Sequence, residues 1–280
     1  MDRQVGIALD RKPVGDLAAA DIARAVTTGF EGYFVPVALE AAGYDARFRA
    51  EDVDPFTSHV YTSGGAFVGI VLIARRGWTS RIAAMGIAKA MRGRGFGAQL
   101  VSAAIRDARE RGDRRMLLEV IATNTRAIRL YERHGFRPMR DLVGFTGRSA
   151  PGIDALREID PVAVARRMLR DGETDLPWQL APETLLKAVA PAVGLALDDR
   201  GVALVAPAGE DKLLLRTLYV PPEHRQRGTS RQLLAAIAAR FPDRTISTPV
   251  AVQSVLSGVF AAPGFTRIAI SQHEMALDLL

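Results

Sequence analysis

The fold is decided by residues 89–100, which read KAMRGRGFGAQL. Gly93, Gly95 and Ala98 match G-x-G-x-x-G/A, the fingerprint of a turn that binds the diphosphate of a dinucleotide. Counted from Arg92, the same letters read R-x-x-G-x-G, a second diphosphate-binding pattern. Both patterns present backbone amides at the start of a helix to phosphate oxygens. The sequence on either side of the loop therefore has to decide between them.

The segments before the loop disfavour the dinucleotide pattern. Such a turn follows its strand almost at once and opens a unit of parallel strands. Here residues 89–92 separate Gly93 from the predicted strand RIAAMGIA at 81–88. Before that strand, HVYTS (59–63) and AFVGIVLIARR (66–76) flank two glycines and predict an antiparallel hairpin. We therefore expect a mixed α/β fold and not a doubly wound one.

The segment after the loop reads LLEVIATNTRAIRLYERHGFRP, residues 117–138. It resembles the second half of the GCN5-related N-acetyltransferase (GNAT) fold. The residues that carry the resemblance are Glu119, Asn124, Ala127, Tyr131, Gly135 and Phe136, together with Arg92, Gly95 and Gly97 of the loop. The resemblance implies a mixed sheet and an enzyme that moves an acetyl group from acetyl-CoA, its acyl-donor substrate, to a primary amine.

The resemblance also implies how acetyl-CoA would bind. Backbone amides of residues 92–97 would cradle its pyrophosphate, because glycines let the backbone approach closely. The preceding strand would be splayed from the next one, so that its free backbone groups pair with the pantetheine arm. Asn124 would hydrogen-bond the pantetheine, or cap the helix that follows it, or both. The expected donor-binding residues are Met85, Gly86, Ile87, Arg92, Gly93, Arg94, Gly95, Phe96, Gly97 and Asn124.

Two residues are candidates for the chemistry. The amine must lose a proton before it attacks the thioester, and the departing sulfur gains one. Tyr131 stands at the family's tyrosine position and is the expected general acid on the CoA thiolate; the alternative is an aromatic residue that packs in the core. Glu119 resembles the proposed base of ribosomal-protein alanine acetyltransferases. The base is thus Glu119 or a water, and a structural role for Glu119 stays open.

The acceptor site is the least defined part of the sequence. Glu31 and Tyr33 lie in GFEGYFVP (29–36), between two predicted helices, where family members form the acceptor pocket. The alternative is a simple turn between helices. Trp178, in TDLPWQ (174–179), is a third candidate. The acceptor itself, a small molecule or a peptide N-terminus, is left open by the sequence.

The second half of the chain repeats part of the first. A shift by 133 positions places RGRGFGAQL (92–100) on RQRGTSRQL (225–233), and ERHGF (132–136) corresponds to AAPGF (261–265). We therefore expect two tandem acyl-CoA N-acyltransferase (GNAT) domains. The predicted boundaries are a catalytic domain at 1–148, a linker with a bridging helix at 149–180, and a second domain at 181–280.

The second copy departs from the pattern at the chemistry. Gln253 and Phe260 stand where the first copy has Asn124 and Tyr131, and Ser230 replaces a glycine of the loop. Phenylalanine has no proton to donate. We therefore expect a degenerate domain that keeps the fold, with a helix before Phe260, and lacks the acid.

Composition narrows the remaining classes. Residues 1–150 hold 23 Lys and Arg against 16 Asp and Glu, which suits a phosphate-bearing partner or a solvated basic surface. We do not expect a nucleic-acid partner, because no aromatic-plus-basic RNA motif occurs. The chain has no cysteine, and its four histidines lack ligand spacing, so no metal site is expected. Without a signal-like N-terminus or an apolar run of membrane-spanning length, we expect a cytoplasmic monomer or homodimer that does not bind membranes.

One rival class remains beside the enzyme. Both copies could bind acyl-CoA without catalysing transfer, in which case the chain would be a regulatory protein. The sequence distinguishes the two only through Tyr131.

Overall fold

The computed structural model describes residues 9–35, 48–148, 150–261 and 264–280, which form two compact units. The first unit contains the chain up to Val120, residues 124–138 and residues 275–280. The second contains residues 121–123 and 139–274. The sequence also predicts a helix at about residues 37–49, the second of the two that flank residues 29–36, and most of it lies outside the described residues. The predicted domain boundaries at 148 and 181 stay a prediction.

The first unit is built on a sheet in the order β1-β2-β3-β4-β5. Every neighbouring pair is antiparallel except β4 and β5, which run parallel. Gly64 and Gly65 join β2 to β3 and both have positive φ, as a type I′ hairpin turn requires. The predicted hairpin is confirmed. The strands are β1 (Asp10–Pro13), β2 (His59–Ser63), β3 (Ala66–Arg76), β4 (Thr79–Ile87) and β5 (Arg115–Ile121).

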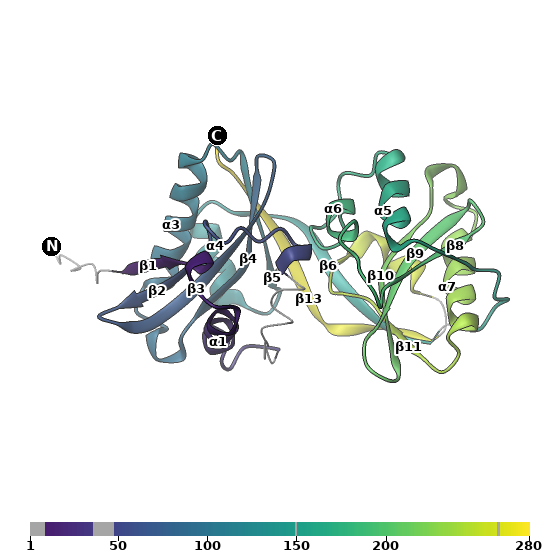
Figure 1. The fold of residues 1–280 in the computed structure, drawn as a ribbon, viewed down its shortest axis with the longest axis horizontal. Coiled ribbons are helices and arrows are strands. Elements are labelled where there is room, and N and C mark those ends of the chain that lie inside the picture. The colour runs from purple at the N-terminus through teal and green to yellow at the C-terminus, as the bar shows by residue number, and fades with distance from the viewer. Residues whose placement is uncertain (1–8, 36–47, 149, 262–263) are drawn as a thin grey trace. The chain divides into compact units, whose positions relative to one another are not determined.

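Helices cover both faces of this sheet (Figure 1). On one face α1 (Ala19–Gly29) packs on Ile70 and Leu72 of β3. On the other, α3 (Phe96–Glu110) and α4 (Thr125–Arg133) pack on a cluster that holds Val71 and Ile73. Alternate residues of one strand thus enter opposite cores, because successive side chains of a strand point to opposite faces. Short 3-10 turns precede α1 at Val14–Asp16 (η1) and α3 at Lys89–Met91 (η2).

The second unit has the sheet order β6-β11-β10-β9-β8-β7, with β12 paired to β6. Its parallel pair is β10 with β11. A core around Leu195, Val205 and Leu215 packs under α7, and a second cluster packs under α5. The elements are β6 (Arg137–Gly147), β7 (Arg157–Ile159), α5 (Pro161–Arg170), α6 (Pro182–Leu185), β8 (Val193–Leu197), β9 (Gly201–Pro207), β10 (Lys212–Tyr219), η3 (Pro222–His224), α7 (Thr229–Arg240), β11 (Thr245–Ser247), β12 (Val252–Gln253) and η4 (Ser254–Val259).

The last strand, β13 (Phe265–Asp278), contributes to both units. Its end and the residues beyond it belong to the first unit, where Met275, Leu277 and Leu279 are buried in the cluster that also holds Met116 and Phe136. The backbone amide of Leu279 donates to the carbonyl of Arg114. Residues 275–280 therefore complete the hydrophobic core of the first unit, which otherwise comes from residues before 139.

The two glycine loops follow the same backbone path. Gly95 precedes α3 with φ 84° and Gly228 precedes α7 with φ 77°. Two residues earlier, Gly93 has φ 82° and its counterpart Gln226 has φ 61°. The second copy keeps the left-handed backbone conformation at Gln226, although this conformation costs a residue with a Cβ about 1 kcal/mol. The loop conformation is thus retained across the repeat.

The helix expected before Phe260 is a 3-10 helix, η4. Its sequence SVLSGV has β-branched residues, serines and a glycine, all poor α-helix formers. No helix among the described residues is long and apolar enough to cross a membrane. Within the same residues, no group of three or more His, Asp or Glu side chains could hold a metal ion.

Candidate active site

The loop between β4 and α3 forms a cradle of free backbone amides. The carbonyl of Gly95 accepts from Ala98 and Gln99. The amides of residues 93–97 donate to no acceptor within the described part of the chain. These amides stand at the positive end of the α3 helix dipole. Amides without acceptors and the positive end of a dipole both favour the binding of an anion. The guanidinium of Arg126 lies beside Gly93 and adds positive charge to the cradle.

A notch opens between β4 and β5 next to this cradle. The two strands pair from Thr79 with Arg115 to Ile82 with Leu118, and the pairing ends there although β4 continues to Ile87. The Ala88 amide donates to Val68 on the β3 side, so by the alternation of an antiparallel strand the backbone groups of Met85 point away from β3. Residues 83–87 of β4 thus form an open edge to which an extended amide-containing ligand can pair.

A cavity of about 560 Å³ joins the cradle to the notch. Its walls come from four places in the first unit: the turn after α1, the end of β4, the loop, and one side of α4 with its cap. The lining residues include Phe30, Tyr33, Met85, Gly86, Ile87, Arg92, Gly93, Gly95, Phe96, Gly97, Asn124 and Leu130. The structure thus brings together all the residues predicted to bind the donor except Arg94, which is exposed and not part of the wall.

Asn124 and Tyr33 meet at this cavity. The Asn124 side chain accepts from the amide of Ala127, 3.2 Å away, and so caps α4. Burial raises the pKa of the Tyr33 phenol, and the adjacent Asn124 side chain lowers it in part. Tyr33 in turn packs edge-on against Phe30, with ring centroids 5.1 Å apart. The helix cap and the predicted acceptor residue are therefore linked by one side chain.

Tyr131 lies behind the wall rather than in it. Its side chain is 7% exposed and belongs to the core cluster, with its ring 5.8 Å from that of Phe136. Ala127 and Leu130, on the same helix, line the cavity. Burial raises the pKa of the Tyr131 phenol, and the nearby Tyr33 raises it further. The phenol is therefore protonated at neutral pH, as an ordinary tyrosine is, and it gives up its proton less readily than a tyrosine in water.

Glu119 is held in a buried ion-pair network. Arg81, on β4, is 2% exposed and contacts Glu119 Oε2 at 2.6 Å and Glu51 Oε2 at 2.6 Å. Its Nε also donates to Glu119 Oε2 at 2.7 Å. The network stands at the point where β4 and β5 diverge, and Glu119 is not in the cavity wall.

Glu31 and Trp178, the other two predicted acceptor residues, do not line this cavity as Tyr33 does. The Glu31 side chain is 60% exposed and lies 3.8 Å from Lys89 Nζ. Trp178 is buried in the second unit, where its carbonyl accepts from the Thr184 hydroxyl. Of the three candidates, only Tyr33 lines the cavity of the first unit.

Comparison with known proteins now identifies the fold. A family model described as the acetyltransferase (GNAT) family matches residues 24–136, which include the cradle, the notch, Asn124 and Tyr131. Residues 24–136 therefore match the GNAT family. No match was found among curated proteins.

Solved GNAT structures share the fold over nearly the whole chain. A GCN5-related N-acetyltransferase from Sphaerobacter thermophilus is 16% identical with a TM-score of 0.68, covering 97% of this chain and 96% of its own. A tandem GNAT protein from the clavulanic acid biosynthesis pathway is 16% identical with a TM-score of 0.66, covering 98% and 99%. The predicted mixed α/β fold with two GNAT copies is confirmed.

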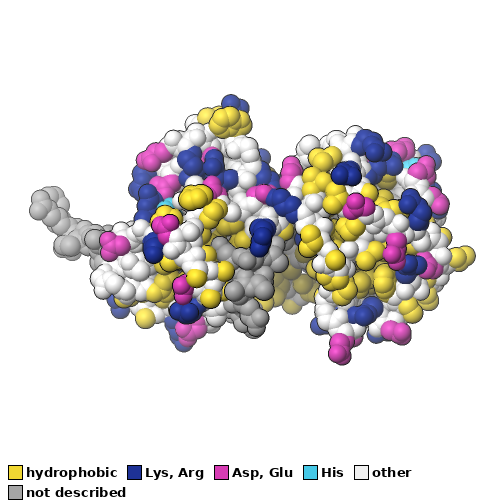
Figure 2. All heavy atoms as spheres, viewed as in Figure 1, with side chains coloured by type: hydrophobic (Ala, Val, Ile, Leu, Met, Phe, Trp, Pro, Cys, Tyr) yellow, Lys and Arg dark blue, Asp and Glu magenta, His cyan; other side chains and the backbone are white. Residues whose placement is uncertain are grey.

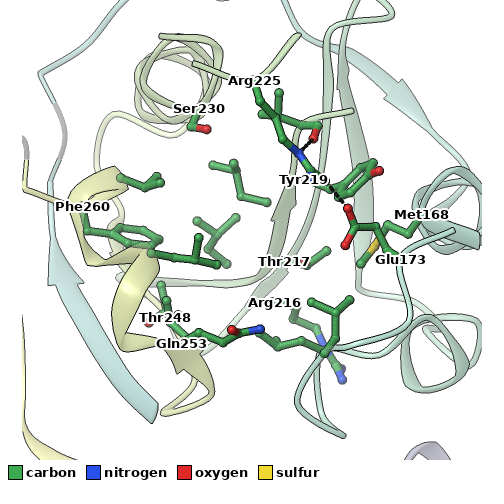
Figure 3. Close-up of a pocket in the computed structure, with 18 of the residues that line it drawn as sticks. Met168, Glu173, Arg216, Thr217, Tyr219, Arg225, Ser230, Thr248, Gln253 and Phe260 are labelled. Carbon is green, nitrogen blue, oxygen red and sulfur yellow. Dashed lines mark hydrogen bonds and ion pairs between the residues drawn. The ribbon is translucent and has the colours of Figure 1, made fainter. Parts of the chain in front are cut away.

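The second GNAT copy has a cavity of its own, of about 540 Å³. Strand β10 pairs with β11 only from Lys212 to Leu214. It continues to Tyr219 without pairing to β11, so the second copy has a notch like the one between β4 and β5. Figure 3 shows Arg225 turned toward Glu173 and Tyr219, with Phe260 on the opposite side of the cavity. The second copy has therefore retained a notch, and a phenylalanine lines it.

Charge on the GNAT surface is mixed. Figure 2 shows Lys and Arg side chains interspersed with Asp and Glu on the visible face. The basic side chains that line the donor cavity are Arg92, Arg126 and Arg133. Positive charge at the cavity is thus local to the loop and to α4.

Two features of this GNAT site escaped the sequence analysis. One is the Arg81 network, and the other is the contact of Gly29 with Gly86. Arg81 and Glu119 each interrupt an apolar strand, and the two strands were expected to be neighbours. Opposite charges inside adjacent buried strands were the signal that could have revealed the pair.

Proposed function

We propose that the first unit is an acetyl-CoA-dependent N-acetyltransferase that moves the acetyl group to a primary amine by direct attack. The observation that carries this proposal is the cradle of free amides opening onto the β4–β5 notch. A diphosphate fits the amides of residues 93–97, and the open edge of β4 at Met85 suits the amides of a pantetheine arm. The thioester would then lie toward Asn124 and Tyr33.

Tyr131 is the proposed general acid. The amine nitrogen attacks the thioester carbonyl, and the C–S bond breaks as the sulfur takes the phenolic proton of Tyr131. The phenol carries its proton at neutral pH. Ala127 and Leu130, on the same helix, line the cavity, and the proposal requires the phenol to reach the sulfur between them.

The base that deprotonates the amine is Glu119 or a water. Arg81 donates two N–H groups to Glu119 Oε2, and Glu119 does not line the cavity. These contacts favour a water as the group that touches the amine, with Glu119 accepting a hydrogen bond from it. The acceptor is proposed to enter beside Tyr33, and the second GNAT copy is proposed to support the first without catalysing transfer.

The test measures thiol release from acetyl-CoA with a panel of primary amines. Tyr131→Phe is expected to lower kcat about 100-fold or more, the usual contribution of a positioned acid, and to leave acetyl-CoA binding in place. Tyr61→Phe is the matched control, because Tyr61 is a buried tyrosine of the same core cluster but lies on β2, which contributes no residue to the cavity wall, whereas α4 does. Equal loss in both variants contradicts the acid role. Tight acetyl-CoA binding with no turnover on any amine would instead favour a regulatory protein.

A further inference from the structure

The side chain of Arg92 binds three main-chain carbonyls. Its Nε donates to the carbonyl of Ile87 at 2.9 Å. Its Nη2 donates to the carbonyls of Gly29 at 3.2 Å and of Glu31 at 2.6 Å. One guanidinium thus joins the end of β4, the first residue of the loop, and the turn after α1.

The turn that Arg92 holds is a wall of the cavity. Phe30, Gly32, Tyr33 and Phe34 all line it. The other backbone bonds of the turn among described residues are local to the turn and α1: Phe30 to Val26 and Thr28, Glu31 to Thr28, and Tyr33 to Phe30. Its position over β4 therefore depends on Arg92 and on what packs beneath it.

The turn packs on β4 without an intervening side chain. A Cβ added to Gly29 would lie 3.0 Å from the Cα of Gly86, and one added to Gly86 would lie 2.9 Å from the Cα of Gly29. The backbone of the acceptor side and the open strand of the donor side are thus in direct contact. Lys89 and Glu31 also join loop and turn, but both are exposed and 3.8 Å apart, so that pair contributes little.

The second copy keeps one of these bonds and has lost the others. Arg225 Nε donates to the carbonyl of Val220 at 3.0 Å, as Arg92 does to Ile87. Its Nη2, however, pairs with the Glu173 side chain. The bond that shapes the loop is common to both copies. The bonds to the carbonyls of a neighbouring turn occur where an acceptor pocket is proposed.

From these contacts we infer that Arg92 couples donor binding to the acceptor pocket, as a positioning residue. The inference rests on the proposed function. A diphosphate held by residues 93–97 fixes the backbone of the loop and with it the start of the Arg92 side chain. The guanidinium then holds the turn at Gly29 and Glu31, so that Tyr33 is in place before an amine arrives. Coupling of this kind is reciprocal, so an ordered turn also favours the bound loop.

The experiment follows hydrogen–deuterium exchange with and without CoA as the probe. In the wild type, CoA is expected to slow exchange at the amides of residues 93–97 and also, by about tenfold, at those of Phe30, Glu31 and Tyr33. In Arg92→Met, the slowing at 93–97 is expected to remain and that at the turn to fall below about twofold. Arg92→Lys keeps the charge and cannot reach three carbonyls, so an intermediate effect is expected.

Lys89→Met is the control, since it removes a positive charge beside the same turn and leaves the guanidinium in place. It is expected to keep the full effect of CoA at the turn. Wild-type protection confined to 93–97, or full protection of the turn in Arg92→Met, overturns the coupling alone. No protection at 93–97 in the wild type overturns the proposed function and the coupling with it. Should Arg92→Met not fold, Arg92→Lys decides by the same comparison.

Discussion

Gly29 and Gly86 meet backbone to backbone, where α1 ends on β4. A methyl group on either glycine would lie within about 3 Å of main-chain atoms of the other. Backbone atoms cannot rotate away as a side chain can, so the two segments would have to separate.

Gly86→Ala is therefore expected to destabilise the protein by about 1–3 kcal/mol, the usual effect of overpacking. It should also displace the turn at Phe30 and weaken acetyl-CoA binding. Urea denaturation measures the first effect and calorimetric titration the second. Gly258→Ala is the control, because nothing lies within 4 Å of its added Cβ. A Gly86→Ala protein as stable as the control would show that the contact is loose.

The glycine at the start of α3 offers a matched pair with the one at its end. Gly95 has φ 84° and Gly112 has φ 78°, and nothing lies within 4 Å of a Cβ at either. Alanine at each site is expected to cost about 1–2 kcal/mol of stability, because both must keep a left-handed backbone. Only Gly95→Ala should weaken acetyl-CoA binding, since only it distorts the amide cradle. Equal dissociation constants for the two variants would argue against a phosphate site at this loop.

The Arg81 network is expected to be the most sensitive buried polar group in the first unit. Arg81→Met removes the buried cation that contacts the Glu51 and Glu119 carboxylates and should cost about 3–5 kcal/mol. Adding Glu51→Gln and Glu119→Gln to the same chain should recover part of that loss, because no buried charge then remains unpaired. Denaturation of the single and triple variants makes the comparison. A triple variant less stable than Arg81→Met would mean that the carboxylates act independently of the arginine.

Ionisation of Tyr131 at high pH should lower the free energy of unfolding. Burial raises the pKa of its phenol, so the folded state binds the proton more tightly than the unfolded state does. Stability from this group is complete below about pH 10, the ordinary tyrosine value, and falls by about 1.4 kcal/mol per pH unit above it. Between pH 10 and 11 the wild type should lose stability faster than Tyr131→Phe by about this amount. Parallel curves would mean that the phenol ionises freely in the folded protein.

The end of β13 should stabilise the first unit. Met275 is fully buried in its core, whereas Leu280, five residues later, is 98% exposed. Met275→Ala is expected to cost about 2–5 kcal/mol and Leu280→Ala to change stability by less than about 0.5 kcal/mol. Thermal unfolding of the two variants is the measurement. If neither variant changes the unfolding temperature, the end of β13 does not stabilise the core of the first unit.

Much of the fold could be predicted because its signals are local. The glycine pair at 64–65, the cap at Asn124 and the apolar face of α3 each specify their element from neighbouring residues. The donor site followed from a motif within one loop. The side-chain role of Arg92 did not, because its partners lie about 60 residues away and are carbonyls, which leave no trace in residue identity. Likewise, nothing in residues 275–280 indicates which of two similar cores they enter.

That C-terminal segment has a consequence for how the protein is made. Residues 275–280 follow residues 139–274 of the second unit in the chain, so the first unit cannot finish its core until the second unit has been synthesised. A chain that stops early leaves an apolar gap beside Met116 and Phe136, the kind of exposed surface that chaperones and proteases detect. A first unit with a complete core therefore occurs only in molecules whose second unit has also been synthesised.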